Sequence, residues 1–465
     1  MNDDKIKSIE NTLKGNFDLK WRKIIKDEGM INFVFIDNLC DTKYIADYIV
    51  KPIISYEGKI DGNIIKNQLL DASIVGEVEK EKEIILHILS GDLIIISNYF
   101  NDILFCEAKG FVRRSVSVPP AEAVIKGPRE GFTETIVDNV SLIRRKVKNE
   151  NLKFETFIVG KNSNTSVALC YIKDVAPTKI VSYIRNKLQT SELDFILDIN
   201  YIEEGLNRRS SVFETSGYSE KPDIIASQLF EGRIAIIVDG TPAVLTLPYF
   251  FIENFQSPDD YYFNKHFVNF IRMQRWIAFF ISILLPGMYL AITTYHFSLI
   301  PTIFVFRLAN SRAGVPFPTI VELLLMISFF QLLREAGLRI PVPVGSSISI
   351  VGSLILGEAA VGAGLASEST VIIVALCSIA TSLTPKLYNS IAIWSLIIIG
   401  FSALLGLPGF YLGFFVLISS VGSLKSCDYP YLFPLTTTSD YKLRDIIFRG
   451  KLKNISKDFL KKDEE

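Results

Sequence analysis

The feature that most constrains this chain is its C-terminal part, where charged side chains almost vanish between residues 276 and 424. Several windows in this stretch hold about 18 or more uncharged, mostly apolar residues, which is the length of a helix that crosses a bilayer. Residues 1–275 are charged and mixed in character, and the chain after residue 425 turns basic again. The sequence therefore predicts an integral membrane protein with a large soluble head.

Composition and the N-terminus narrow the class further. Charged residues make up 21% of the chain and the formal net charge is −1, which argues against nucleic acid as a partner. The first residues lack the apolar segment of a signal peptide, so we expect the head to stay in the cytoplasm. The five cysteines are far apart, and neither they nor the three histidines have metal-ligand spacing. We predict buried free thiols, no metal and no cofactor.

Two segments of the head resemble each other. Residues 31–53 and 167–188 each contain an apolar strand, an acid, a short connection and a Thr-Lys pair that leads an amphipathic helix. A glycine-led hairpin follows later in each half, at 91–108 and 232–248. This repeat predicts two related α/β subdomains in which strands and helices form layers.

The predicted architecture is an α/β cytosolic head of two related subdomains followed by an all-α polytopic membrane domain with four to six membrane segments. The expected boundaries are 1–30 for an N-terminal amphipathic helical arm, 31–118 for α/β subdomain I, 119–153 for a connector, 154–260 for α/β subdomain II, 261–425 for the membrane domain and 426–465 for a basic cytoplasmic tail.

The connector contains the motif Gly-Pro-Arg-Glu-Gly-Phe, followed by an amphipathic helix from Thr133 on. The only feature that favours a phosphate site here is the set of backbone N–H groups at the start of that helix. The motif is neither a Walker sequence nor a dinucleotide fingerprint. We therefore expect the connector to fix how two subdomains or two subunits meet. The residues assigned to coupling or assembly here are Pro119, Pro120, Glu122, Gly127, Pro128, Arg129, Glu130 and Gly131.

Prolines, glycines and charges separate the expected membrane segments. Their ranges are 276–295, 318–333, 345–366, 370–385 and 387–424, the last long enough for two short helices hinged at 406–409. Basic flanks place the head and the C-terminal tail together in the cytoplasm. Arg307 and Arg312 do not fit six crossings, so four or five remain open.

The stretch 334–367 is the least lipid-like part of the membrane domain. It is rich in Gly, Ala and Ser, which let helices approach closely, and it contains the acid Glu358. Glu322 lies in the preceding segment, and a carboxylate in a membrane faces water or a partner rather than lipid. These acids either line an ion path or pair between helices, for example Glu322 or Glu335 with Arg334 or Arg339. Arg334, Glu335 and Arg339 are also candidates for coupling or assembly.

Serines in the same stretch and the absence of catalytic motifs complete the site predictions. Ser346, Ser349 and Ser353 share a helical face, which either lines a narrow polar path or only permits close packing. The sequence contains no Gly-x-Ser-x-Gly elbow, no P-loop and no kinase pattern. We therefore predict that the protein is not an enzyme.

Four segments, 118–134, 311–325, 332–365 and 423–435, resemble the GerA family of spore germination proteins, in the order expected for that family. The GPREGF and REAGLR blocks carry the most specific part of this likeness, which runs from about residue 30 to residue 440. Glu358 stands where many relatives carry glutamine and Gly362 where many carry an acid. The placement of acids along this helix is therefore not carried over from the family.

The resemblance implies a subunit of a nutrient germinant receptor in the spore inner membrane, acting with a transporter-like B subunit and a lipoprotein C subunit. It implies a homo-oligomer that forms a cation-conducting channel, with monovalent cations and membrane lipid as further partners. The alternative is a non-conducting scaffold or an accessory paralogue that works beside the dipicolinic acid export system. A secondary transporter is disfavoured because the membrane domain shows no convincing inverted repeat.

Overall fold

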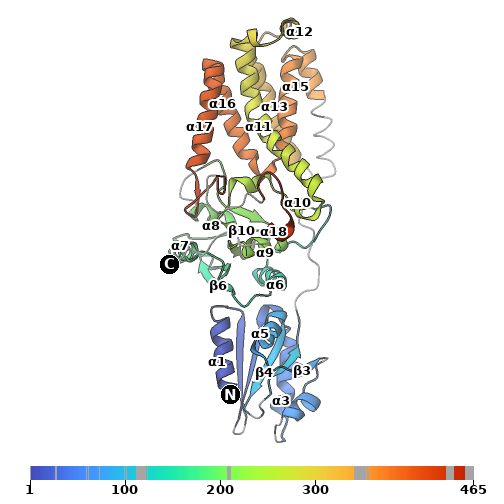
Figure 1. Ribbon diagram of the computed structural model, residues 1–465, viewed down its shortest axis with the longest axis vertical. Helices are drawn as coiled ribbons and strands as arrows, with labels where there is room; N and C mark the ends of the chain where they lie inside the picture. The colour runs from blue at the N-terminus through green and yellow to red at the C-terminus, as the bar shows by residue number, and fades with distance from the viewer. Residues whose placement is uncertain are drawn as a thin grey trace. The chain divides into compact units, whose positions relative to one another are not determined.

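A computed structural model describes most of the chain and divides it into two compact units (Figure 1). The described residues are 2–26, 29–58, 60, 62–72, 74–98, 100, 102–110, 122, 124–206, 211–339, 352, 355–435 and 445–455. We call the first unit, Met1–Arg208 with Ser216–Tyr249 and Leu452–Glu465, the head. The second unit, Arg209–Thr215 with Phe250–Lys451, is called the helical unit.

The head contains two antiparallel five-stranded sheets with the same strand order. The first has the order β1-β2-β4-β5-β3, from β1 (Leu19–Lys26), β2 (Gly29–Ile36), β3 (Val75–Glu77), β4 (Asp92–Ser97) and β5 (Leu104–Glu107). The second has the order β6-β7-β9-β10-β8, from β6 (Leu152–Val159), β7 (Thr165–Ile172), β8 (Gly217–Ser219), β9 (Ile234–Val238) and β10 (Val244–Leu247). The α/β class predicted for the head is confirmed.

Helices cover both faces of the first sheet because its central strands are apolar on both sides. Val34 and Ile94 face α1 (Asn2–Leu13) and α5 (Glu81–Ser90), whereas Phe33 and Ile95 face the opposite core. That second core is closed by consecutive helical segments, α2 (Thr42–Tyr44), η2 (Ile45–Val50), α3 (Lys51–Ser55), α4 (Gly62–Ile64) and η3 (Ile65–Leu69).

The second sheet has an equivalent arrangement. One face packs against α6 (Ile136–Lys146) and α9 (Pro222–Phe230), which bury Val140 and Ile225 against it. The other helices of this half are α7 (Thr178–Gln189), which contacts β6, and α8 (Ile199–Leu206), which contacts β10.

The expectation of a helical arm over residues 1–30 is wrong beyond Leu13. Residues 19–26 instead form β1, which pairs with β2 along its whole length, from Leu19 opposite Ile36 to Lys26 opposite Gly29. Trp21 favours an extended chain, and the charges on β1 keep this edge strand from pairing with other molecules. The short apolar spacings of this segment fit the period of a strand as well as that of a helix.

A buried ion pair joins the N-terminal segment to the second half of the head. Arg144 on α6 donates from Nε and from a terminal nitrogen to the two carboxylate oxygens of Asp18, each at 2.6 Å. Both side chains are almost fully buried. Asn16 accepts from the Phe154 N–H at 3.1 Å, which fixes the same segment to β6.

The pH dependence of this joint depends on Lys153, whose Nζ donates to the Thr12 carbonyl at 2.6 Å. Burial, followed by the charges of Lys173 and Arg144, lowers the pKa of Lys153 from 10.5 to about 8. Above that pH the folded chain loses this proton while the unfolded chain keeps it, so the unfolded state binds more protons and stability rises with pH up to about 10.5. We expect the unfolding midpoint of the wild-type chain to rise relative to Lys153→Met across this window. A difference that stays constant with pH would contradict this expectation.

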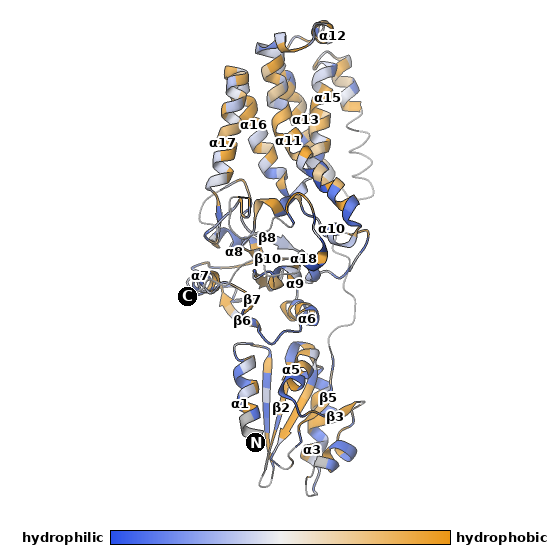
Figure 2. Ribbon diagram, in the orientation of Figure 1, coloured by the Kyte–Doolittle hydropathy of each residue, from blue (hydrophilic) through white to orange (hydrophobic). Residues whose placement is uncertain are grey.

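The helical unit is built around one long helix, and apolar residues run along its members (Figure 2). Its helices are α10 (Asp259–Tyr262), α11 (Lys265–Tyr295), α12 (Thr302–Arg312), α13 (Thr319–Arg339), α15 (Glu368–Ser382), α16 (Tyr388–Leu405) and α17 (Leu407–Ser423), with residues 355–362 also helical. α11 packs against α13, α15, α16 and α17. Gly287 lets α16 approach closely, because a Cβ there would lie 2.7 Å from Ile398.

Two described helices are long and apolar enough to cross a membrane, Lys265–Tyr295 and Pro385–Leu405, where four to six were predicted. Glu368–Ser382 and Leu407–Ser423 are apolar but shorter. A helix of the length of α15 rises about 22 Å, less than the roughly 30 Å of a bilayer core. α13 is long enough but contains Glu322, Arg334, Glu335 and Arg339, and much of the predicted segment 345–366 lies outside the described residues. The hinge expected at 406–409 is confirmed, because α16 ends at Leu405 and Gly406 adopts a φ of +65°.

Candidate functional site

The start of the connector folds against the second sheet, and its helix α6 also contacts the first half of the head through Asp18 and residues Asp37–Leu39. Glu122 accepts hydrogen bonds from the Ser219 hydroxyl at 2.6 Å and from the Glu220 N–H at 2.9 Å. The fully buried Lys221 donates from Nζ to the Pro128 carbonyl at 2.6 Å. These contacts hold the start of the motif at β8 and α9.

The rest of the motif is held by α6. Glu130 lies 3.2 Å from Arg145 and 3.3 Å from Lys146, and these two charges lower the pKa of Glu130 although burial opposes them. Gly127 adopts a φ of +118°, and Arg129 is exposed. Pro119 and Pro120 lie outside the described residues.

The backbone N–H groups at the N-terminus of α6 are not available to bind an external anion. The Ile136 N–H donates to the Asp239 carboxylate at 3.0 Å, and the Thr133 N–H donates to Asn139 at 2.8 Å. Side chains of the protein therefore occupy the positions that a phosphate would need. This supports a structural role for the motif in the second half of the head.

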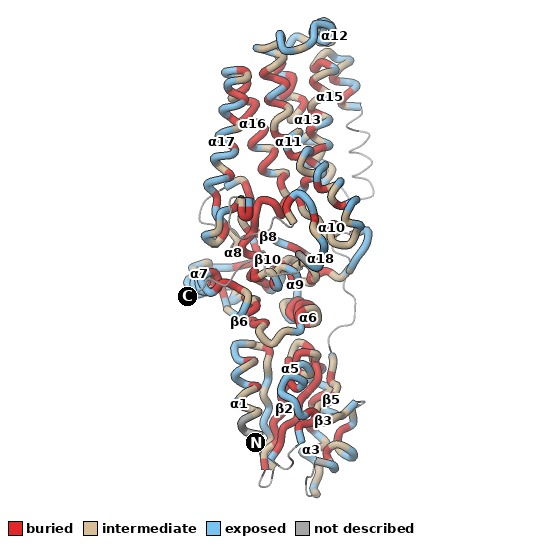
Figure 3. The backbone as a smooth tube through the Cα atoms, viewed as in Figure 1, coloured by how far each residue is buried: buried red, intermediate tan, exposed pale blue. Residues whose placement is uncertain are grey.

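Buried and exposed residues alternate along the helices of the helical unit (Figure 3), and Glu322 on α13 is fully buried. One carboxylate oxygen accepts from the Ser367 N–H at 2.9 Å and from the Thr370 hydroxyl at 3.1 Å. The other lies 3.5 Å from Nε of Arg312. Tyr289 extends this network, with its hydroxyl 3.1 Å from that of Thr370. Glu322 thus caps the start of α15 and links four helices, which is interhelical pairing rather than an open ion path.

Of the example pairings suggested for the membrane-edge charges, Glu335 with Arg339 forms, although within one helix. Arg339 pairs with Glu335 one turn earlier on α13, and both side chains are exposed. Arg334 instead lies over the ring of Tyr388, with its guanidinium carbon 3.6 Å from the ring centre. The example pairing of Glu322 with Arg334 or Arg339 is therefore wrong. Arg312 takes that place because the chain between α12 and α13 folds back.

Glu358 contrasts with Glu322. It lies in the helical residues 355–362, where it is exposed together with Ile355, Ala359 and Gly362. Within the described part of the chain it has no ion-pair or hydrogen-bond partner. Ala359 and Gly362 on this face are small, so another helix can approach Glu358 closely on that side. Ser346, Ser349 and Ser353 lie outside the described residues and stay predictions.

A second buried charge cluster lies where the helical unit begins. Asp260 accepts from Arg272 at 2.7 Å and from Arg275 at 2.8 Å, and Arg272 also donates to Asp445 at 2.5 Å. Arg449 donates to the backbone carbonyl of Asp260. No local pattern in the sequence points to Asp445, which is 173 residues away from Arg272.

The polar segment 211–215 belongs to the helical unit although the chain before and after it belongs to the head. Ser390 on α16 donates to the Val212 carbonyl at 2.7 Å, and Ser426 donates to the Thr215 carbonyl at 2.6 Å. Phe213 is buried, with its ring centre 6.0 Å from that of Phe251.

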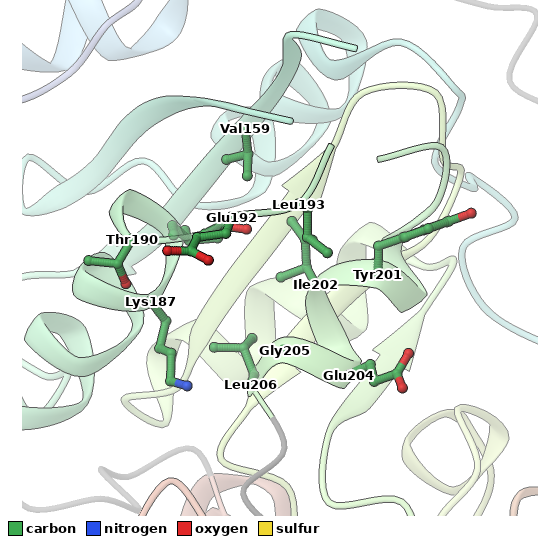
Figure 4. Close-up of a pocket in the computed structure, with 12 residues that line it drawn as sticks. Val159, Lys187, Thr190, Glu192, Leu193, Tyr201, Ile202, Glu204, Gly205 and Leu206 are labelled. Atoms are coloured by element: carbon green, nitrogen blue, oxygen red, sulfur yellow. The ribbon is translucent and has the colours of Figure 1, made fainter. Parts of the chain in front are cut away.

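A cavity of about 450 Å³ opens in the second half of the head, between the end of α7, residues 190–193 and α8 (Figure 4). Leu193 and Ile202 form apolar walls, and Lys187 and Glu204 lie on separate elements at its rim. The cavity is suited to a small amphipathic solute. No motif in the sequence marks it, because its walls come from three separate segments.

Comparison with known proteins shows one family across nearly the whole chain. The sequence model of the family described as "Bacillus/Clostridium GerA spore germination protein" matches residues 7–458. The chain is 37% identical to "Spore germination protein KA" of Bacillus subtilis (strain 168), over 91% of this chain and 79% of that protein. It is 34% identical to "Uncharacterized membrane protein YfkQ" of the same organism, over 96% of this chain and 88% of that protein.

A solved structure is also similar. It is the N-terminal domain of the A subunit of the Bacillus megaterium spore germinant receptor GerK3, at 25% identity and a TM-score of 0.38. The similarity covers 52% of this chain and 92% of that one.

Proposed function

Because this chain belongs to the GerA family of spore germination proteins, we propose that it is a membrane subunit of a nutrient-sensing germinant receptor. The two long apolar helices of the helical unit support insertion into a membrane. We place it in the spore inner membrane, with the head and the C-terminal tail on the cytoplasmic side. Its proposed partners are the B and C subunits of the receptor and further copies of itself.

The finer proposal is that these copies surround a path for monovalent cations, and Glu358 carries it. An exposed carboxylate on a membrane-embedded helix is costly against lipid, so it needs water or another subunit. The small residues around Glu358 allow neighbouring helices to bring such carboxylates together. A ring of carboxylates around water attracts cations and repels anions. Glu322 does not take part, because its oxygens are already engaged inside one chain.

We expect Glu358→Gln to lower potassium conductance by about tenfold at low salt, since loss of the ring charge lowers the local cation concentration. The measurement is single-channel current of the purified full-length protein in planar bilayers. The matched control is Glu368→Gln, which removes the same charge at the exposed start of α15. That control should conduct like the wild type.

Two outcomes would count against the ion path. Equal conductance and selectivity in wild type and Glu358→Gln would indicate that Glu358 contributes only to packing between subunits. Silence from folded wild-type protein together with its B and C subunits would favour the alternative, a non-conducting scaffold or accessory germination subunit.

A further inference from the structure

The helical unit encloses a cavity of about 270 Å³ between α11, α13, α15 and α16. α13 and α15 run side by side in the same direction, because Glu322 near the start of α13 caps the start of α15. Towards their C-terminal ends the cavity is lined by Gln331, Arg334 and Thr381. Nearer to Glu322 the lining is apolar, with Ile327 and Val374.

Arg334 is the charged group of this cavity, and its charge is not neutralised by the described residues. No carboxylate among them lies within ion-pair distance of Arg334, and the neighbouring Glu335 is engaged by Arg339. The ring of Tyr388 holds one face of the guanidinium at 3.6 Å. Stacking of this kind leaves the N–H groups at the guanidinium edge directed sideways, where they can bind two oxygens of one anion.

The cavity wall formed by α16 is partly exposed on the outside of the helical unit. Ile393 and Leu396 line the cavity and are still 45% and 46% exposed. Among the described helices, α16 and α11 are the two long and apolar enough to cross a membrane. A ligand can therefore enter sideways from the bilayer, with its charged end at Arg334 and its apolar part along the cavity.

Serine and threonine hydroxyls in the lining do not change this charge balance. Ser328 donates its proton to the Leu324 carbonyl at 2.8 Å, and Thr381 donates to the Cys377 carbonyl at 2.8 Å. The anion at this site would thus take its donors from Arg334 and Gln331, which suits a single phosphate group.

We propose that this cavity binds an anionic phospholipid, with the phosphate on Arg334 and part of an acyl chain between α13, α15 and α16. Basic pockets between membrane helices recognise anionic headgroups by this combination of charge and apolar surface. The proposal is independent of ion conduction, since it concerns the inside of a single helical unit.

The test uses full-length protein reconstituted in bilayers of equal phosphatidylglycerol and phosphatidylcholine, then extracted in detergent for native mass spectrometry. We expect the wild type to retain phosphatidylglycerol in preference to phosphatidylcholine. Arg334→Gln should retain about tenfold less phosphatidylglycerol, because it loses charge-assisted hydrogen bonds to the phosphate. Arg339→Gln removes the same charge from the same helix outside the cavity and should retain as much as the wild type.

A second variant keeps the test decisive if Arg334→Gln unfolds. Ser378→Leu leaves Arg334 in place and fills the cavity, so it should also lower the retained phosphatidylglycerol. Equal retention in wild type, Arg334→Gln and Ser378→Leu would overturn the proposal. Displacement of the bound lipid by inorganic phosphate alone would overturn it too, because it would indicate a simple anion site.

Discussion

Asparagine in place of Asp260 is expected to lower the free energy of unfolding of the helical unit by about 3–5 kcal/mol, the cost of breaking a buried ion pair by removing one charge. Asp260 is 2% exposed and accepts from both Arg272 and Arg275, and Arg272 is itself fully buried. Asparagine keeps the shape but leaves two guanidinium groups beside each other. Asp445 then remains as the single carboxylate partner of Arg272.

Fluorescence of Trp276 provides the measurement, because its ring stacks on Phe255 at 3.7 Å close to this cluster. Denaturant unfolding of the full chain in detergent should show an earlier transition for Asp260→Asn in a background without the other tryptophans. Glu335→Gln is the matched control, since its exposed pair with Arg339 is worth at most about 1 kcal/mol. Equal midpoints for Asp260→Asn and the wild type would show that the cluster contributes no net stability.

The second large effect is expected at the joint of the head. Asp18→Asn should destabilise the head by about 3–5 kcal/mol, because Arg144 would stay buried without its charge partner. The guanidinium also lies over the ring of Phe154, with 4.6 Å between its carbon and the ring centre, so it cannot turn to water without losing that contact. Loss of this ion pair should separate the N-terminal segment from β6 before the sheets themselves unfold.

Hydrogen exchange of the full chain distinguishes this outcome. Amides of β1 and β6 should exchange faster in Asp18→Asn, while those of α16 in the helical unit should not change. The double variant Asp18→Leu with Arg144→Met should recover much of the stability, since apolar groups of similar size replace a buried ion pair at little cost. Faster exchange in both variants to the same extent would assign the effect to packing rather than to the unpaired charge.

The proposed ion path depends on a difference between two acids that have similar surroundings in the sequence. Glu322 and Glu358 both stand among apolar residues, and both were candidates for an ion path. The structure separates them, because folding brings Arg312, Ser367 and Thr370 to Glu322 and leaves Glu358 exposed. Whether Glu358 lines a path is tested by conductance, whereas Glu322 is expected to act on stability.

The sequence by itself determined the classes of structure and the places where they change. The repeated pattern of apolar strand and amphipathic helix indicated the α/β head. The loss of charge after residue 276 indicated the helical unit, and glycines marked the hinge between α16 and α17. These features are local, since the period of side chains along a strand or helix is set by backbone geometry. The REAGLR and GPREGF blocks indicated the family in the same local way.

Only the tertiary structure decided which distant residues meet. The partners Asp18 and Arg144 are 126 residues apart, and Arg272 and Asp445 are 173 apart. No periodicity relates such positions, because their contact depends on how complete helices and sheets pack. The same reason explains the strand at 19–26, because neighbouring β2 supplies the hydrogen-bond partners of β1. It also explains the number of long apolar helices, because neighbouring elements set where α15 ends.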